Sequence, residues 1–190
     1  MTTFEFIFAL YSLLLGLALA EILTGLGRAI EHRYASDAAD TAFELGWLTP
    51  LLAVFVILDL LSFWAFAWVA REHLQVSTQT LLAVVAFASC YYLAARLVFP
   101  TDPKAFRTLD THYFRVRRIV MLILVALVFA QWAFNLSVPA ISERVFTPFA
   151  IGMTAVLVAG MTAAAFAKNK AISTGLLTLL CARYLYLYLT

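Results

Sequence analysis

The stretch FVILDLLSFW, residues 55–64, decides the class of fold. It lies within an apolar segment from Trp47 to Val69 in which Asp59 is the only charged residue. A helix needs about 20 mostly apolar residues to cross the hydrocarbon core of a bilayer, and this segment has that length. The stretch therefore predicts a transmembrane helix that carries a carboxylate close to its midpoint.

The rest of the chain has the same character. Hydrophobic residues make up 64% of its 190 residues and charged residues only 13%, which leaves too few polar side chains to cover a water-soluble domain. Six segments are long and apolar enough to span a bilayer, roughly residues 4–27, 47–69, 78–98, 116–138, 146–167 and 171–188. We therefore predict an all-α integral membrane protein in which residues 1–190 form a single domain of six transmembrane helices.

The first span contains the triplet ALA at residues 18–20, which resembles a signal-peptide cleavage site. A signal peptide begins with basic residues, whereas the start of this span carries Glu5 and no lysine or arginine. We therefore expect the span to be retained as a helix.

Several helix ends are marked by proline. Three residues that can cap a helix N-terminus, Thr49, Asp102 and Thr147, each stand directly before a proline, which is favoured at the first helical position. Each of them is predicted to start a helix. Pro139 is predicted to end the fourth span, because proline cannot continue a helix.

Two connections have informative sequences. PTDPKAFRTLDTHYF, residues 100–114, is both polar and aromatic, which predicts a short interfacial helix between the third and fourth spans. The KNK turn at residues 168–170 is very short, so the fifth and sixth spans are predicted to be antiparallel neighbours.

Basic residues are distributed unevenly over the loops. The loops after the first, third and fifth spans hold nine lysines and arginines, whereas those after the second and fourth hold two, Arg71 and Arg144. Because basic loops stay on the cytoplasmic side, we expect both termini on the outer side, in the periplasm of a bacterial inner membrane. The aromatic residues then expected toward the outer boundary are Trp64, Trp68, Trp132, Tyr184, Tyr186 and Tyr188.

A cluster of basic residues flanks the predicted interfacial segment. It consists of Lys104, Arg107, Arg115, Arg117 and Arg118. Each such charge contributes about 1 kcal/mol of attraction to an anionic leaflet, so the cluster is predicted to contact anionic lipids on the inner face. The net charge of +2 is too small to indicate nucleic-acid binding.

Four charged residues are predicted at the depth of the hydrocarbon: Glu21, Asp59, Arg96 and Arg183. Each charge costs about 2.5 to 3.5 kcal/mol there unless it pairs, reaches the surface or meets water. With a rise of about 1.5 Å per residue, Asp59 matches Arg183 in depth, and Glu21 matches Arg96 nearer the inner face. We therefore predict two ion pairs, Asp59 with Arg183 and Glu21 with Arg96.

Two neutral polar residues accompany these charges. Gln131 and Asn135 are four residues apart and so share one face of the fourth span, and Gln131 is expected to complete the cluster at Asp59. Two interpretations of the cluster remain open. Either the ion pairs are structural and fix the helix register, or Asp59 binds a cation or proton on a polar path and Arg183 tunes its proton affinity.

No cofactor is predicted. An intramembrane haem needs facing histidines, whereas His32, His73 and His112 lie in or beside loops, and retinal needs a lysine within a span. Cys90 and Cys181 are single and lie within spans, so we interpret them as small packing residues. No catalytic residue is predicted, since no known enzyme motif occurs in the chain.

A weak metal-binding pattern lies on the predicted inner face. His32, Asp37, Asp40 and His112 are of types that bind divalent metals, and Asp102 and Asp110 are close to them in the predicted topology. The spacing matches no metal motif, and Asp102 and Asp110 are better interpreted as helix caps. We therefore predict no metal site.

Three functions fit these observations. The intramembrane charges favour a small channel or transporter for an ion or proton. The glycine-rich face of the first span, with Gly16, Gly25 and Gly27, and the basic cluster favour a non-catalytic accessory or lipid-organising subunit, as a homo-oligomer or with a membrane-complex partner. A membrane enzyme acting on lipids is the third.

Overall fold

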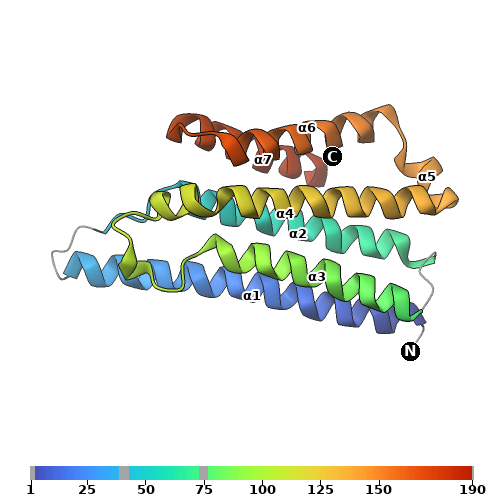
Figure 1. The fold of residues 1–190 in the computed structure, drawn as a ribbon, viewed down its shortest axis with the longest axis horizontal. Helices are drawn as coiled ribbons and strands as arrows, with labels where there is room; N and C mark the ends of the chain where they lie inside the picture. The colour runs from blue at the N-terminus through green and yellow to red at the C-terminus, as the bar shows by residue number, and fades with distance from the viewer. Residues whose placement is uncertain (1–2, 39–42, 73–76, 190) are drawn as a thin grey trace.

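The structure is a computed structural model that describes residues 3–38, 43–72 and 77–189 (Figure 1). This part of the chain contains seven α-helices and two short 3₁₀ turns. The α-helices are α1 (Thr3–Ala38), α2 (Leu48–Val69), α3 (Thr78–Val98), α4 (Leu109–Ser137), α5 (Pro139–Val145), α6 (Pro148–Phe166) and α7 (Lys170–Leu189), and the 3₁₀ turns are η1 (Ala70–Glu72) and η2 (Pro103–Ala105). Six of the described helices, all except α5, are long and apolar enough to cross a membrane, which confirms the predicted class of fold.

The six long helices form a bundle of three stacked pairs. Figure 1 shows α1 beside α3 on one side, α2 with α4 through the middle, and α6 with α7 on the other side. Contacts between α3 and α4, α4 and α6, and α2 and α7 hold the pairs together. Consecutive long helices run in opposite directions, so the connections α1–α2, α3–α4 and α6–α7 meet at one end of the bundle (Figure 1). We call this the basic end and the opposite one the terminal end.

The bundle has an apolar core and an apolar exterior. Leu52, Phe55 and Val56 of α2 and Leu124 of α4 are fully buried in one continuous core. Many large hydrophobic side chains also face outward along the helices, among them Leu82 and Phe129. Water would disfavour such an exterior, whereas lipid tails favour it, so the surface suits the predicted solvent.

Two helices differ from the predicted spans. Helix α1 continues to Ala38, well beyond the predicted end at residue 27, and α4 begins at Leu109 rather than at residue 116. Hydropathy marks only the apolar part of a helix, whereas backbone hydrogen bonding continues through polar residues until a cap or breaker ends it. The start of α4 is set by Thr108, whose hydroxyl accepts a hydrogen bond from the Asp110 amide at 3.4 Å.

Most of the predicted helix caps are confirmed. Asp102 accepts a hydrogen bond from the Lys104 amide at 3.0 Å, and Thr147 accepts one from the Ala150 amide at 3.1 Å. Helix α4 ends at Ser137, two residues before Pro139 as expected, although Pro139 then begins the short α5. The prediction for Thr49 is wrong, because α2 already begins at Leu48.

The segment 100–114 is not a separate helix of the expected kind. Its middle forms the three-residue 3₁₀ turn η2, and its last residues are the first turns of α4. The polar and aromatic residues that predicted an interfacial helix are therefore divided between a turn and the end of a longer helix. The expected neighbours α6 and α7 do lie in contact across their short turn.

Small residues allow close packing at two places. A Cβ atom at Gly25 would lie 2.6 Å from Phe99, so this glycine permits close approach as predicted. Gly160 of α6 does the same, since a Cβ there would lie 2.8 Å from Leu180. By contrast, Gly16 and Gly27 face open space, with nothing within 4 Å of a Cβ added at either position. The glycines of α1 therefore do not form one packing face within the bundle.

Candidate functional site

Asp59 lies at the centre of the bundle, in the middle of α2, and its side chain is 0% exposed. The Tyr184 hydroxyl of α7 donates a hydrogen bond of 2.5 Å to Oδ1 of Asp59. The Tyr91 hydroxyl of α3 lies 3.3 Å from Oδ2 and also donates to the Val56 carbonyl at 2.6 Å. Three helices therefore meet at this one carboxyl group.

The predicted ion pair between Asp59 and Arg183 is not formed. Arg183 donates from Nε to the Met153 carbonyl of α6 at 3.0 Å, and its guanidinium lies 4.9 Å from the centre of the Tyr184 ring. Within the described residues, no cation comes within ion-pair distance of Asp59. The depth estimate was sound, but consecutive residues point about 100° apart around a helix, and Tyr184 rather than Arg183 faces Asp59.

Arg183 instead lines a small pocket of about 200 Å³ near Asp59. We call it the polar pocket after Arg183, Gln131 and Thr154, although much of its wall is apolar. Gln131 lies in the same pocket, so the two polar residues predicted to accompany Asp59 are neighbours on one cavity. Tyr184 also lines this pocket, so one side chain contacts both the pocket and the Asp59 carboxyl group. Asn135, one turn further along α4, is 2% exposed, and its Oδ1 has no hydrogen-bond partner within the described chain.

Tyrosines around Asp59 were missed by the sequence analysis. Tyr184 was expected among the aromatics of the outer boundary, yet it is 3% exposed and bonded to Asp59. Tyr188, one turn later, donates to the Leu58 carbonyl at 2.7 Å. The sequence did contain a signal for this contact, namely a tyrosine within a span at the depth of Asp59. Tyrosine suits a buried acid because its ring is apolar and its hydroxyl can form a hydrogen bond.

The second predicted ion pair is confirmed. Arg96 approaches Glu21 at 3.3 Å, and Arg28 lies 3.6 Å from the same carboxylate oxygen. Arg96 also donates to the Thr101 hydroxyl at 2.8 Å. All three charged side chains are partly exposed, so this cluster ties α1, α3 and the α3–α4 connection together near the basic end.

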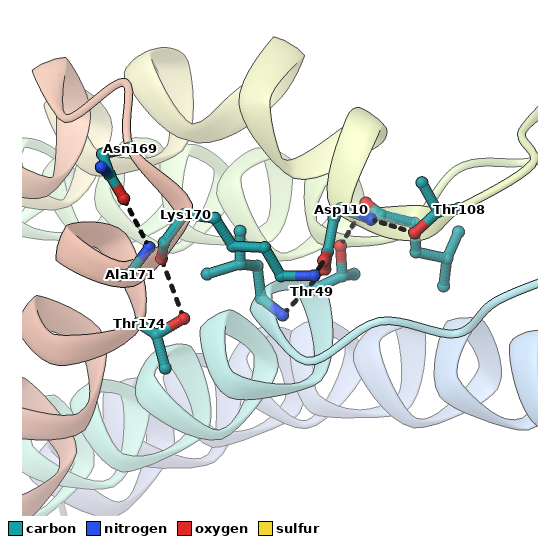
Figure 2. Close-up of polar contacts among 9 residues, drawn as sticks. Thr49, Thr108, Asp110, Asn169, Lys170, Ala171 and Thr174 are labelled. Atoms are coloured by element: carbon teal, nitrogen blue, oxygen red, sulfur yellow. Dashed lines mark hydrogen bonds and ion pairs between the residues drawn. The ribbon is translucent and has the colours of Figure 1, made fainter.

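A further acid–base cluster lies at the basic end, on α2, α4 and α7 (Figure 2). Oδ1 of Asp110 accepts a hydrogen bond from the Leu48 amide at 3.0 Å, so this carboxylate caps α2 from a neighbouring helix. Lys170, the first residue of α7, forms an ion pair with the same carboxylate. Thr49 adds a hydrogen bond of 2.8 Å from its hydroxyl to the Leu109 carbonyl. Asp110 is thus a helix cap as predicted, but of α2 and not of its own helix.

Glycine is required beside this carboxylate. Gly46 has φ = 65°, and a Cβ at this position would collide with the Asp110 carboxylate. Both its left-handed backbone and the close approach favour a residue without a side chain.

The basic cluster does not form one uniform surface. Arg117 is only 5% exposed and donates to the Phe114 carbonyl of its own helix at 2.8 Å, so its predicted contact with lipid is corrected. Lys104, Arg107, Arg115 and Arg118 are exposed as expected. The neighbouring residues Tyr113 and Ser173 are fully buried, which places Arg117 at the covered interface of α4 and α7.

The weak metal-ligand candidates are not brought together. His112 is bonded through Nε2 to the Leu97 carbonyl at 3.1 Å, and His32 packs against the Phe43 ring at 4.5 Å between centres. Asp37 lies in the last turn of α1, and Asp40 lies outside the described residues. Within the described chain, no three histidine, cysteine, aspartate or glutamate residues form a metal-binding group.

The two cysteines differ in their surroundings. Cys181 is buried in the core as expected for a small packing residue, whereas Cys90 is exposed. Cys90 lines an apolar groove of about 760 Å³ in the half of the bundle nearer the terminal end, formed by α1, α2, α3 and α4. Tyr11 and Gln131 are among the few polar side chains on its wall.

The geometry above can be compared with known proteins. No known family, curated protein or solved structure matches this chain. The arrangement itself must therefore indicate the chemistry. A buried carboxyl group held by tyrosines can bind and release a proton, and an adjacent polar pocket can hold a small solute beside it.

Proposed function

We propose that this protein is a small membrane transporter in which Asp59 is the proton-carrying group. One observation carries the proposal: a fully buried carboxyl group in the middle of a spanning helix is bonded to tyrosine hydroxyls and to no cation among the described residues. An ionised carboxylate without a counter-charge is strongly disfavoured in such a place. A neutral, protonated carboxyl group does not carry this penalty. The site therefore favours a proton carrier over a structural ion pair.

The hydrogen bonds around Asp59 support a protonated carboxyl group. A tyrosine hydroxyl carries a single proton. Tyr91 directs its proton to the Val56 carbonyl at 2.6 Å, an oxygen that only accepts. Its 3.3 Å contact with Oδ2 of Asp59 is then the weaker of the two, and a protonated carboxyl group that donates to the tyrosine oxygen would strengthen it.

The surroundings of Asp59 support proton exchange on one side. Toward the basic end, the core residues Leu52, Phe55 and Val56 are fully buried. On the other side, Tyr184 both bonds to Asp59 and lines the polar pocket. A rotation of the Tyr184 side chain would connect the two, which is the kind of small gate that a transporter closed to one side requires.

The membrane orientation belongs to the same proposal. The excess of basic residues on the connections of the basic end supports placing that end in the cytoplasm and both termini in the periplasm of a bacterial inner membrane. The segment with η2 would then lie at the inner interface, where exposed Lys104 and Arg107 meet anionic lipid head groups. Association into a homo-oligomer or with another membrane protein is part of this proposal.

Proton flux in liposomes tests the proposal. The protein is reconstituted into vesicles with a trapped pH-sensitive dye, and the internal pH is followed after an external acid pulse. In vesicles with wild-type protein, the internal pH should change faster than in protein-free vesicles. With Asp59→Asn, the rate should fall to that of protein-free vesicles, because asparagine keeps the shape of the side chain but carries no titratable proton. Asp102→Asn, which alters an exposed capping acid, is the matched control and should retain the wild-type rate. Wild-type flux in Asp59→Asn, or no flux in wild type, would contradict the proposal.

A lipid-organising role is a second candidate, and the apolar groove favours it. The groove of about 760 Å³ extends along α3 from Gln79 to Cys90, which corresponds to about 17 Å of helix rise. Half of a bilayer core is about 15 Å thick, so the groove matches the hydrocarbon depth of one leaflet. Replacing Ala83 and Ala130 on its walls by phenylalanine should reduce the lipid that co-purifies with the protein. Unchanged lipid content would count against this role.

A further inference from the structure

We infer that the polar pocket beside Asp59 binds a small monovalent anion on Arg183. The assignment of this anion as the solute that moves with the proton rests on the function proposed above. The binding site itself stands on separate observations, which concern the charge of Arg183, its unused donors and the size of the pocket.

Arg183 is a cation without a counter-ion. The guanidinium group stays charged at every physiological pH, and no carboxylate of the described residues comes within ion-pair distance of it. Its stacking against the Tyr184 ring covers one face of the group and leaves its charge unpaired. A charge at this depth in a membrane calls for a compensating charge, and the described part of the chain does not supply one.

The hydrogen-bond donors of Arg183 are also only partly used. Nε donates to the Met153 carbonyl at 3.0 Å, which fixes the direction of the guanidinium group. Nη1 is buried and has no hydrogen-bond partner within the described chain. A buried donor without an acceptor is disfavoured, so an acceptor in the pocket would satisfy both the hydrogen bond and the charge.

The remaining pocket wall suits an anion. Arg183 is the only charged residue on it, and the titratable side chains beside it are the hydroxyls of Tyr184 and Tyr188. Asp59 lies behind Tyr184 and is bonded to it. Gln131 presents an amide that forms no hydrogen bond with other described residues, and Thr154 adds a hydroxyl. The hydroxyls of Tyr184 and Tyr188 already donate elsewhere, and much of the remaining wall is apolar. The groups on the wall that can hold an anion are therefore Arg183, Gln131 and Thr154.

The size of the pocket limits the ligand. Its volume of about 200 Å³ corresponds to roughly six or seven water molecules at about 30 Å³ each in the liquid. This space accommodates a halide, nitrate, formate or a similarly small carboxylate, but not a nucleotide. One guanidinium compensates one negative charge, which favours a monovalent anion.

The charges also indicate how the anion and the proton are related. The proton resides on the neutral Asp59 carboxyl group, and the anion compensates Arg183, so each site is neutral when filled. If both solutes cross together, one positive and one negative charge move in the same direction and the net charge transferred is zero. The inferred process is therefore electroneutral co-transport of a proton with a small anion.

Equilibrium binding tests the site without requiring transport. The purified protein in a non-ionic detergent is titrated with radiolabelled formate and, separately, with radiolabelled chloride, in a zwitterionic buffer that contains no other small anion. Wild type should bind at least one of the two saturably, and Arg183→Gln should weaken that binding by about tenfold or more. Arg118→Gln, which changes an exposed arginine at the basic end, is the matched control and should bind as wild type does.

Two additions keep the test decisive. If Arg183→Gln does not fold, Gln131→Leu retains the arginine and should still weaken binding measurably. Asp59→Asn should bind the anion while losing proton flux, which separates the two proposals. Binding without proton flux would leave the anion site standing and overturn the role of Asp59, whereas proton flux without saturable binding of either probe would overturn the anion site. Unchanged binding in both pocket variants would overturn it as well.

Discussion

Replacing Tyr184 by phenylalanine removes the hydroxyl that donates to Asp59 at 2.5 Å and leaves the rest of the ring in place. Oδ1 of Asp59 is fully buried, so no water replaces the lost donor. Leaving a buried polar group unsatisfied costs about 1–3 kcal/mol, and hydrogen bonds between membrane helices average about 0.6 kcal/mol with a maximum near 1.7. We therefore expect Tyr184→Phe to lower the free energy of unfolding by about 1–2 kcal/mol.

A double-mutant cycle makes this prediction specific. Asp59→Leu leaves the Tyr184 hydroxyl without its acceptor, and the double variant Asp59→Leu/Tyr184→Phe removes both groups, so it should lose less stability than the two single variants combined. The coupling energy should be about 1 kcal/mol. The corresponding cycle of Asp59 with Arg183 should give a smaller coupling energy, about 0.5 kcal/mol or below, because these two side chains form no ion pair.

The free energies are measured by titrating the protein in mixed micelles with a denaturing detergent and following helix content. Tyr92→Phe is the matched control, because this tyrosine also lies on a spanning helix but is exposed. It should change the free energy of unfolding by no more than about 0.5 kcal/mol. A coupling of Asp59 with Arg183 larger than that with Tyr184 would refute the reasoning and restore the ion pair that the sequence suggested.

Three further predictions concern the basic end and the orientation. Gly46→Ala should lower the free energy of unfolding by more than about 1 kcal/mol, since φ is 65° and the new methyl group meets the Asp110 carboxylate; an unchanged unfolding midpoint would contradict this. Asp110→Ala should destabilise the protein more than Lys170→Met does, because Asp110 also caps α2 whereas Lys170 is largely exposed. Equal losses of unfolding free energy in the same titration would show that the cap is unimportant. Single cysteines introduced at Ala140 should react with a membrane-impermeant reagent added to intact cells and those at Lys104 should not, and the reverse pattern would invert the proposed topology.

The sequence was sufficient to predict the six spanning helices, because lipid imposes a length and a composition that can be read directly from the residues. The pair of Glu21 with Arg96 was also predictable. Arginine has a long flexible side chain, so matching depth alone brings it within reach of an acid on a neighbouring helix.

The partners of Asp59 required information that hydropathy does not contain. Depth along a helix follows from residue number, but the direction in which Arg183 and Tyr184 point depends on how α7 is rotated against α2. That rotation is set by packing among many apolar side chains, and no local pattern reports it. The capping of α2 by Asp110 is similarly non-local, since 62 residues separate the carboxylate from the Leu48 amide.

Two acid–base clusters join segments of the bundle at its basic end. At the basic end, the backbone of Glu44 bonds to that of Arg107 at 2.9 Å, Asp110 joins α2 to α4 and α7, and Glu21 joins α1 to α3. Near the terminal end, α1 and α2 are joined by a bond of 3.0 Å from the Trp64 indole to Ser12, while the groove and the polar pocket loosen the packing around it. Charged side chains thus hold the helices at the basic end and neutral hydrogen bonds hold them around Asp59, while both cavities lie in the terminal half. In the proposed transporter, a solute would therefore approach Asp59 from the terminal end.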